Sequence, residues 1–267
     1  MNGPLFIRTL AAHRIRLLAA GSGMFAWGFV LPIIYATFGQ DLKQLVEGNP
    51  LLSQFAQFGG GDVFSLHGSI ALGFIHPFTL VLMGIFAVGF STLAVAGERQ
   101  RGTLEVILSR PISRHTFYLT LLVAGALFLA ILLASHLIAS VLSASLMGVL
   151  AELSLANLPP LWLVGWLLFM CFLAIGFAAS VSFDRLAPAL GITLTIVLVS
   201  YLLEVVGSLW PDAAWLQEYS LFHYMAAKEV LDGGIRAGDV LLLGAVILAA
   251  VAYGWIVFPR RDLAAPS

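Results

Sequence analysis

The sequence predicts an all-α integral membrane protein with six transmembrane helices. Of its 267 residues, 60% are hydrophobic and only 10% are charged, and the mean hydropathy is +1.00. Soluble globular domains carry about 25% charged residues, so the composition excludes that class. The apolar residues also gather in runs of about 20, the length that a helix needs to cross a hydrocarbon core of ~30 Å. Composition and run length together predict the fold class.

Six such runs are present, and we expect one helix in each. The first contains no charged residue, and the third is longer than a bilayer requires, so we expect the third to tilt or protrude. Transmembrane β-strands would instead show alternating segments of about ten residues. The chain is therefore expected to form a single transmembrane domain over residues 1–267, with outer segments 39–69 and 210–239. The predicted spans are 17–38, 70–96, 116–150, 158–183, 188–209 and 240–258.

The first run is predicted to be an uncleaved helix rather than a signal peptide. It is longer than the 7–15-residue core of a signal peptide, and no A-x-A-like cleavage site follows Phe38. The preceding segment, residues 3–16, is basic and moderately amphipathic. It is expected to form an interfacial helix, with a disordered basic tail as the alternative. The single cysteine, Cys171, falls inside the fourth run, so no intrachain disulfide is possible.

The basic residues predict the orientation of the chain. Alternation of six spans places ten of the 13 lysines and arginines on the side that holds both termini. Membrane proteins keep such an excess on the cytoplasmic side, so both termini are predicted to be cytoplasmic. The net charge of −1 gives no reason to expect a nucleic-acid partner. The ten residues are Arg8, Arg14, Arg16, Arg99, Arg101, Arg110, Arg114, Arg185, Arg260 and Arg261.

The densest cluster of charge lies between the second and third runs, in the segment GERQRGTLEVILSRPISR, residues 97–114, which we call the hinge. Gly102 is expected to end the second helix in the left-handed region, and Thr103 to cap a new one. The Arg110-Pro111 pair should stop that helix, because the residue before proline disfavours the α region. Ser113 can then cap the third span.

The hinge is therefore predicted to contain a short amphipathic helix from Thr103 to Ser109. Leu104, Ile107 and Leu108 recur at helical spacing and would share one face. The alternative is a solvated loop that only obeys the positive-inside rule. The capping residues, the apolar face and the proline stop favour an ordered element.

The hinge resembles the signature that follows the second span in ABC type-2 transporter permeases. That signature reads acidic-basic-x-x-Gly-Thr-Leu-Glu and ends in small-x-Pro-x-Ser-Arg, and residues 97–114 match it almost without gaps. Weaker similarity spans the chain: the six helices, the basic N-terminal segment where the family has its elbow helix, and Phe258-Pro259-Arg260 near the end. Where the family often has Glu-Arg-Glu, this chain has Glu98-Arg99-Gln100.

The resemblance implies a division of labour between subunits. In this family a cytoplasmic ATPase docks on the hinge, called the coupling helix, and the permease pairs with a second copy or a related chain in the prokaryotic plasma membrane. The implied ATPase-coupling residues are Glu98, Arg99, Arg101, Gly102, Thr103, Leu104, Glu105, Arg110 and Arg114.

The chain lacks the sequence motifs of an ATPase. No G-x-x-x-x-G-K-[ST] phosphate loop is present, so ATP and Mg²⁺ are expected on the partner subunit and no cofactor on this chain. An intramembrane enzyme is disfavoured because no H-E-x-x-H or G-x-S-x-G motif occurs. A non-transporting scaffold or sensor that docks a cytoplasmic partner stays open. The cargo stays open too: lipid, peptide antibiotic, drug or ion.

Two polar residues inside the spans are candidates for a translocation path. Glu204 lies toward the outer side of the fifth span, and a carboxylate at that depth marks either a pathway or a hydrogen-bonded neutral group. His136 lies in the third span without the neighbours that a metal site needs, so packing is the alternative and no metal is expected. Ser135, Ala139, Ser143 and Ala144 form a small-residue stripe suited to close helix contact.

The outer segments carry interfacial aromatic residues. They are interpreted either as an extracytoplasmic gate or as membrane-surface anchors. Asn49-Pro50 is expected to begin a short helix in the first of them.

Overall fold

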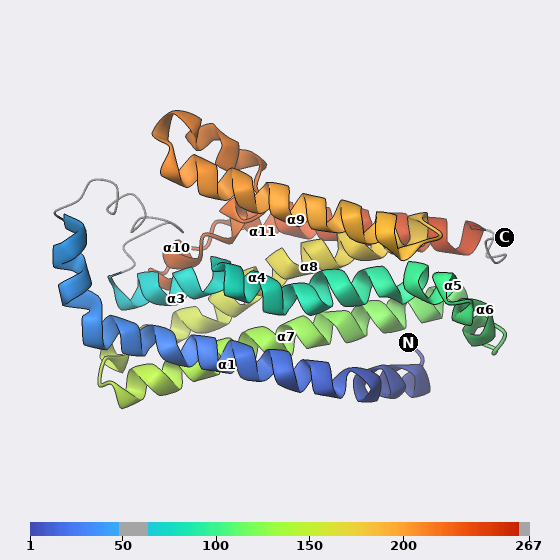
Figure 1. Ribbon diagram of the computed structural model, residues 1–267, viewed down its shortest axis with the longest axis horizontal. Helices are drawn as coiled ribbons and strands as arrows, with labels where there is room; N and C mark the ends of the chain where they lie inside the picture. The colour runs from blue at the N-terminus through green and yellow to red at the C-terminus, as the bar shows by residue number, and fades with distance from the viewer. Residues whose placement is uncertain (48–63, 262–267) are drawn as a thin grey trace.

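A computed structural model describes residues 1–47 and 64–261, and within them every regular element is helical. The long helices lie side by side along the longest axis of the molecule (Figure 1). Five are long and apolar enough to cross a membrane, and the count is six if a bent pair of helices forms one span, so five to six candidate spans stand against the six predicted. The five are α1 (Gly3–Glu47), α7 (Arg114–Leu146), α8 (Leu158–Ser182), α9 (Leu186–Leu209) and α11 (Ala237–Arg260).

Both chain ends and the hinge lie at the same end of the bundle, which we call the hinge end (Figure 1). This arrangement follows from an even number of spans. The opposite end, which we call the distal end, carries the connection between α7 and α8 and the connection between α9 and α11. All the predicted coupling residues therefore lie on the side that holds both termini.

The N-terminal segment differs from its prediction in one respect. Residues 3–16 are helical, but they continue without a break into the first span, so α1 is a single helix of 45 residues and no separate elbow helix is present. No glycine or proline lies between Leu5 and Ala20, and nothing in the sequence stops the helix from propagating there. At ~1.5 Å per residue such a helix is about 68 Å long, well beyond the thickness of a bilayer.

The second span is built from several pieces. Helices α3 (Leu66–Ile75) and α4 (Pro77–Gly84) meet at His76 with a bend of 44°. The bend is placed by Pro77, which has no N–H to continue the first helix. The His76 ring nitrogen Nδ1 accepts a hydrogen bond from the Phe78 amide at 3.2 Å and so caps the second piece. The uninterrupted span predicted over 70–96 is thus a broken one.

Beyond α4 the second span winds more widely than an α-helix. The π-helical segments η1 (Ile85–Phe90) and η2 (Leu93–Gly97) lead into the single turn α5 (Glu98–Gln100). Wide turns of this kind leave backbone groups without their usual partners and are found often at functional sites. Here they lie directly before the hinge.

The core is organised around α8, which packs against α7, α9, α11 and both π-helical segments. Helix α1 packs mainly on α7. There the Ser135 hydroxyl donates to the Gly21 carbonyl at 2.9 Å, and the Ser140 hydroxyl donates to the Gly28 carbonyl at 3.1 Å. Small residues permit this close approach, as the stripe on the third span predicts.

Short helical elements close the distal end: η3 (Leu150–Glu152), η4 (Leu155–Asn157), η5 (Pro211–Tyr219), η6 (His223–Met225) and α10 (Ala227–Leu231). Element η5 folds back onto α9. The Asn157 amide donates to the Leu231 carbonyl at 2.8 Å and ties two of the connections together. The helix predicted from Asn49-Pro50 lies outside the described residues.

Candidate functional site

The hinge contains a short helix at the predicted place, α6 (Thr103–Leu108). Gly102 before it has φ +70, in the left-handed region, as predicted, and a Cβ there would meet nothing within 4 Å. Only the backbone conformation therefore calls for glycine. Thr103 is the first helical residue rather than the cap, so that detail of the prediction is wrong.

Glu98 stabilises the turn between α5 and α6 through contacts with neighbouring residues of the hinge. Its carboxylate forms an ion pair with Arg101 and accepts a hydrogen bond from the Thr103 hydroxyl at 2.5 Å. The same hydroxyl lies 3.1 Å from the Glu98 carbonyl oxygen. Thr103 thus fastens α6 to the end of α5, in place of the capping bond expected of it. Glu98 shapes the hinge rather than simply adding charge to its surface.

The apolar face of α6 points into the protein, as predicted. Leu104 is only 1% exposed, and Ile107 and Leu108 are half-buried. Val106 faces the other way and is 66% exposed. Glu105 is also exposed, and no ion pair or hydrogen bond engages its carboxylate among the described residues. One side of α6 is therefore anchored, and the other is free to contact a partner.

The end of the hinge follows the predicted order. Helix α6 stops before Arg110-Pro111, and α7 begins at Arg114. The Ser113 hydroxyl accepts a hydrogen bond from the Thr116 amide at 3.1 Å and caps the third span, as predicted. Arg110 itself is exposed.

Arg99 turns inward, away from the hinge surface. Its side chain is only 9% exposed, and its Nη1 lies 2.9 Å from Asp184 in the turn between α8 and α9. Arg261, at the end of α11, contacts the same Asp184 oxygen at 2.6 Å and donates to the Val181 carbonyl at 2.8 Å. One carboxylate thus joins the hinge, the α8–α9 turn and the end of the last span.

Two further side chains strengthen this connection. The Gln100 side-chain carbonyl accepts a hydrogen bond from the Leu186 amide at 2.8 Å, at the start of α9. The Arg114 guanidinium donates to carbonyl groups at the end of α11, at 3.1 Å from Pro259 and 2.7 Å from Arg261. Both flanks of α6 are therefore tied to the hinge-end termini of other spans.

The π-helical segment before the hinge is bonded to α8 by one serine. The Ser180 hydroxyl accepts hydrogen bonds from the Val95 and Ala96 amides at 3.0 and 2.9 Å. It also donates to the Thr92 carbonyl at 2.8 Å. A hydroxyl has one donor and two acceptor sites, so all of them are used. Sequence reasoning missed Ser180, because nothing in the local pattern shows that its partners are unpaired amides 84 residues away.

The two candidate translocation residues lie in different parts of the bundle. Glu204 on α9 is 8% exposed and accepts a hydrogen bond from the Gln217 side chain of η5 at 2.9 Å. His136 on α7 is fully buried and packs edge-on against Phe74, with ring centroids 5.1 Å apart. A Cβ at Gly73 would come within 2.8 Å of its ring. Their part in translocation stays a prediction.

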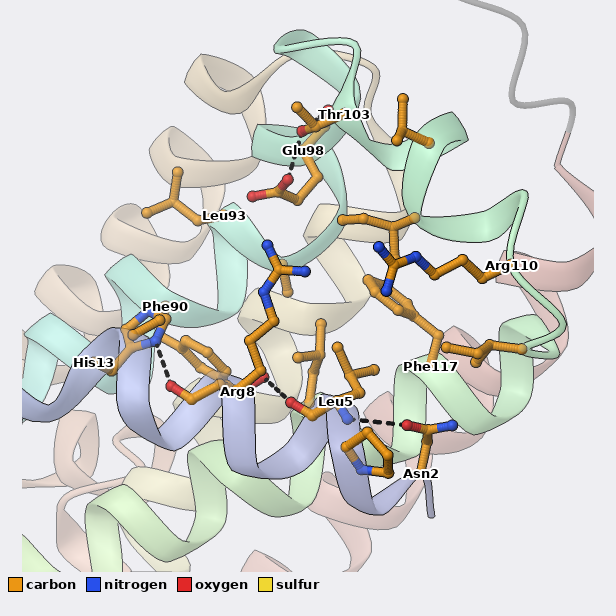
Figure 2. A pocket seen from close by; sticks show the side chains of 18 of the residues that line it. Asn2, Leu5, Arg8, His13, Phe90, Leu93, Glu98, Thr103, Arg110 and Phe117 are labelled. Carbon is orange, nitrogen blue, oxygen red and sulfur yellow. Dashed lines mark hydrogen bonds between the residues drawn. The ribbon is translucent and has the colours of Figure 1, made fainter.

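A cavity of about 740 Å³ lies between the hinge and the start of α1 (Figure 2). It includes predicted coupling residues Glu98, Arg101, Thr103 and Arg110 in its lining. Within the described part of the chain, no group of three His, Cys, Asp or Glu side chains is placed to hold a metal ion.

The comparison with known families decides the identity of the chain. The profile described as ABC-2 family transporter protein matches residues 22–263. The chain belongs to this family. It is the membrane permease of an ABC transporter, a multi-pass transport subunit that is not itself catalytic, and permeases of this family work with an ABC ATPase. No curated protein matches the permease significantly.

Proposed function

We propose that this permease exports a cargo with energy from ATP hydrolysed by a separate cytoplasmic ATPase, which docks on the hinge. The observation that carries the proposal is the construction of α6. It exposes Glu105 and Val106 on one side and buries Leu104 on the other. A surface helix that is packed against the permease on one face can bind the ATPase on the other face and move with it while staying attached to the permease.

The predicted coupling residues then take two roles. Arg101, Gly102, Thr103, Glu105 and Arg110 are exposed and form the docking face, to which we add Val106. Glu98, Arg99, Leu104 and Arg114 support that face from within the permease. Movement of α6 would pass through Asp184 and Ser180 into α8, around which the core is organised.

The chemistry of ATP hydrolysis is assigned to the partner. Without a phosphate loop the permease has no nest of backbone amides for nucleotide, so ATP and Mg²⁺ would bind the ATPase and this chain would need no cofactor. The positive-inside asymmetry supports a cytoplasmic hinge end in a prokaryotic plasma membrane. Export is the direction that the family resemblance favours.

We further propose that two permeases assemble with two ATPases. ATPases of this class act in pairs, and one hinge offers one docking face. Helix α9 is suited to a partner copy or to lipid, since it leaves a row of apolar side chains exposed, including Leu198 at 56% and Leu202 at 57%. In the scaffold alternative the hinge would bind a partner without coupling it to transport.

The docking face is tested by reversing one exposed charge. We expect Glu105→Lys to weaken retention of the ATPase by tagged permease, because reversing one partner of an interfacial charge pair costs about 2 kcal/mol or more, which is roughly 30-fold in Kd. Glu218→Lys is the matched control, since Glu218 is exposed in η5, one of the elements that close the distal end. Equal ATPase retention by both variants would rule out Glu105 as a docking contact. If the parent permease retains the ATPase but no candidate cargo stimulates ATP hydrolysis, the scaffold alternative is favoured.

A further inference from the structure

The cavity at the hinge end has walls from four parts of the chain (Figure 2). The start of α1 forms one side, and the π-helical end of the second span, α6 and the start of α7 form the others. Its volume of about 740 Å³ lies within the range of small-ligand sites, roughly 300–1,000 Å³. The cavity is thus large enough for a ligand.

The charge of the cavity is strongly positive. Four arginines and one glutamate line it, which leaves a net charge of +3 with His13 neutral. The glutamate, Glu98, is occupied by Arg101 and Thr103. No described carboxylate lies within ion-pair distance of Arg8, Arg16 or Arg110. Three guanidinium groups are therefore available to an anion.

The inner wall of the cavity is apolar. Phe90 and Leu121 are 5% and 8% exposed, and Phe117 is 1% exposed. The ring of His13 stands edge-on to Phe90, with centroids 5.0 Å apart. A free phosphate would use the arginines alone and leave this wall unused. The pairing of guanidinium groups with an apolar wall fits a molecule that has both an anionic head and an apolar tail.

The position of α1 gives such a molecule a route from the membrane. Leu5, Arg8, Ala12 and Arg16 recur three or four residues apart and face the cavity together. Next to them, Ile7, Ile15 and Leu18 are 68–73% exposed, as expected of side chains that face lipid. The arginines thus lie beside an apolar surface that continues into the bilayer.

We infer that this cavity binds an anionic phospholipid. Arg8 and Arg16 hold its phosphate, and one acyl chain lies against Phe90 and Leu121. Because Ile107 of α6 also lines the cavity, the bound lipid packs against the inner face of the hinge helix.

The test compares binding of two lipids with the same acyl chains, one with a zwitterionic and one with an anionic headgroup. The full-length permease, purified without its ATPase, is placed in nanodiscs of phosphatidylcholine with a small fraction of phosphatidylglycerol of the same chains, and the retained lipid is counted by native mass spectrometry. We expect phosphatidylglycerol to be retained preferentially. Arg8→Gln and Arg16→Gln should each lower that retention about fivefold, the effect of removing one basic group that faces an anionic lipid.

Arg14→Gln is the matched control, because Arg14 is exposed on the same helix and does not line the cavity. An equal loss in Arg14→Gln would overturn the site, since it would show attraction to basic residues in general. Displacement of phosphatidylglycerol by millimolar inorganic phosphate, or lack of preference over phosphatidylcholine, would overturn the lipid as ligand. Ala12→Phe should reduce retention by narrowing the cavity, and unchanged retention would contradict the tail position. No ATPase is present, so these results are independent of the proposed coupling.

Discussion

Arg99 and Arg101 lie two positions apart in the hinge, but one side chain is buried and the other is exposed. The Arg99 side chain is 9% exposed and contacts Asp184, whereas Arg101 is 55% exposed and contacts Glu98 three residues earlier. The sequence indicates a charged hinge but cannot distinguish these roles, because Asp184 is distant along the chain. The local pair between Glu98 and Arg101 is the kind of contact that spacing alone can suggest.

Gly102 offers a residue-scale test with no steric complication. A side chain there would meet nothing within 4 Å, so the effect of substitution comes from φ +70 alone. Left-handed backbone costs an ordinary L-residue about 1–2 kcal/mol, and asparagine tolerates it better. We expect Gly102→Val to lower ATPase retention and Gly102→Asn to preserve most of it, with normal membrane insertion in both.

Co-purification with the ATPase measures this difference, and the thermal midpoint of each purified variant reports on its folding. Parental ATPase retention by Gly102→Val would show that the left-handed turn does not position α6. Equal losses in the two variants would point instead to a direct contact at Gly102.

At the scale of elements, hydrophobic length predicts the spans well because it reflects the thickness of the bilayer. Helices α7, α8, α9 and α11 lie within a few residues of their predicted ranges. The bend at His76 could have been read from the proline that follows it. The π-helical winding could not, since two of its amides donate hydrogen bonds to the Ser180 hydroxyl on another helix.

Ser180 provides the element-scale prediction. Replacement by alanine removes three hydrogen bonds and takes the Ser180 acceptor away from two buried amides. Side-chain hydrogen bonds between membrane helices average about 0.6 kcal/mol each, so we expect Ser180→Ala to destabilise the permease by about 2 kcal/mol. Ser208→Ala is the control, because the Ser208 hydroxyl donates to the Val205 carbonyl of its own helix.

Thermal unfolding of both variants in one detergent provides the measurement. The midpoint should fall clearly for Ser180→Ala and much less for Ser208→Ala. If the two midpoints matched, the bond between the second span and α8 would contribute nothing to stability.

For the whole molecule, the chain's path places the proposed ATPase-docking face at one end. Both termini, the hinge, Asp184 and Arg261 lie at the hinge end, while η4 and η5 close the distal end (Figure 1). Alternation of the predicted spans gives this arrangement from the sequence. The continuity of α1 and the cavity beside it depend on how α1 packs against the other helices, which the sequence pattern does not specify.

The most direct measurement of ATPase docking on the hinge is photo-crosslinking in native membranes. A photoreactive amino acid replaces Val106, which is 66% exposed on α6, or Leu155, which is 53% exposed in η4 at the distal end. The expected result is a crosslink from position 106 to a protein that mass spectrometry identifies as an ABC ATPase, and none from position 155. Absence of an ATPase crosslink at position 106, with the variant present in the membrane at parental level, would contradict docking on the hinge.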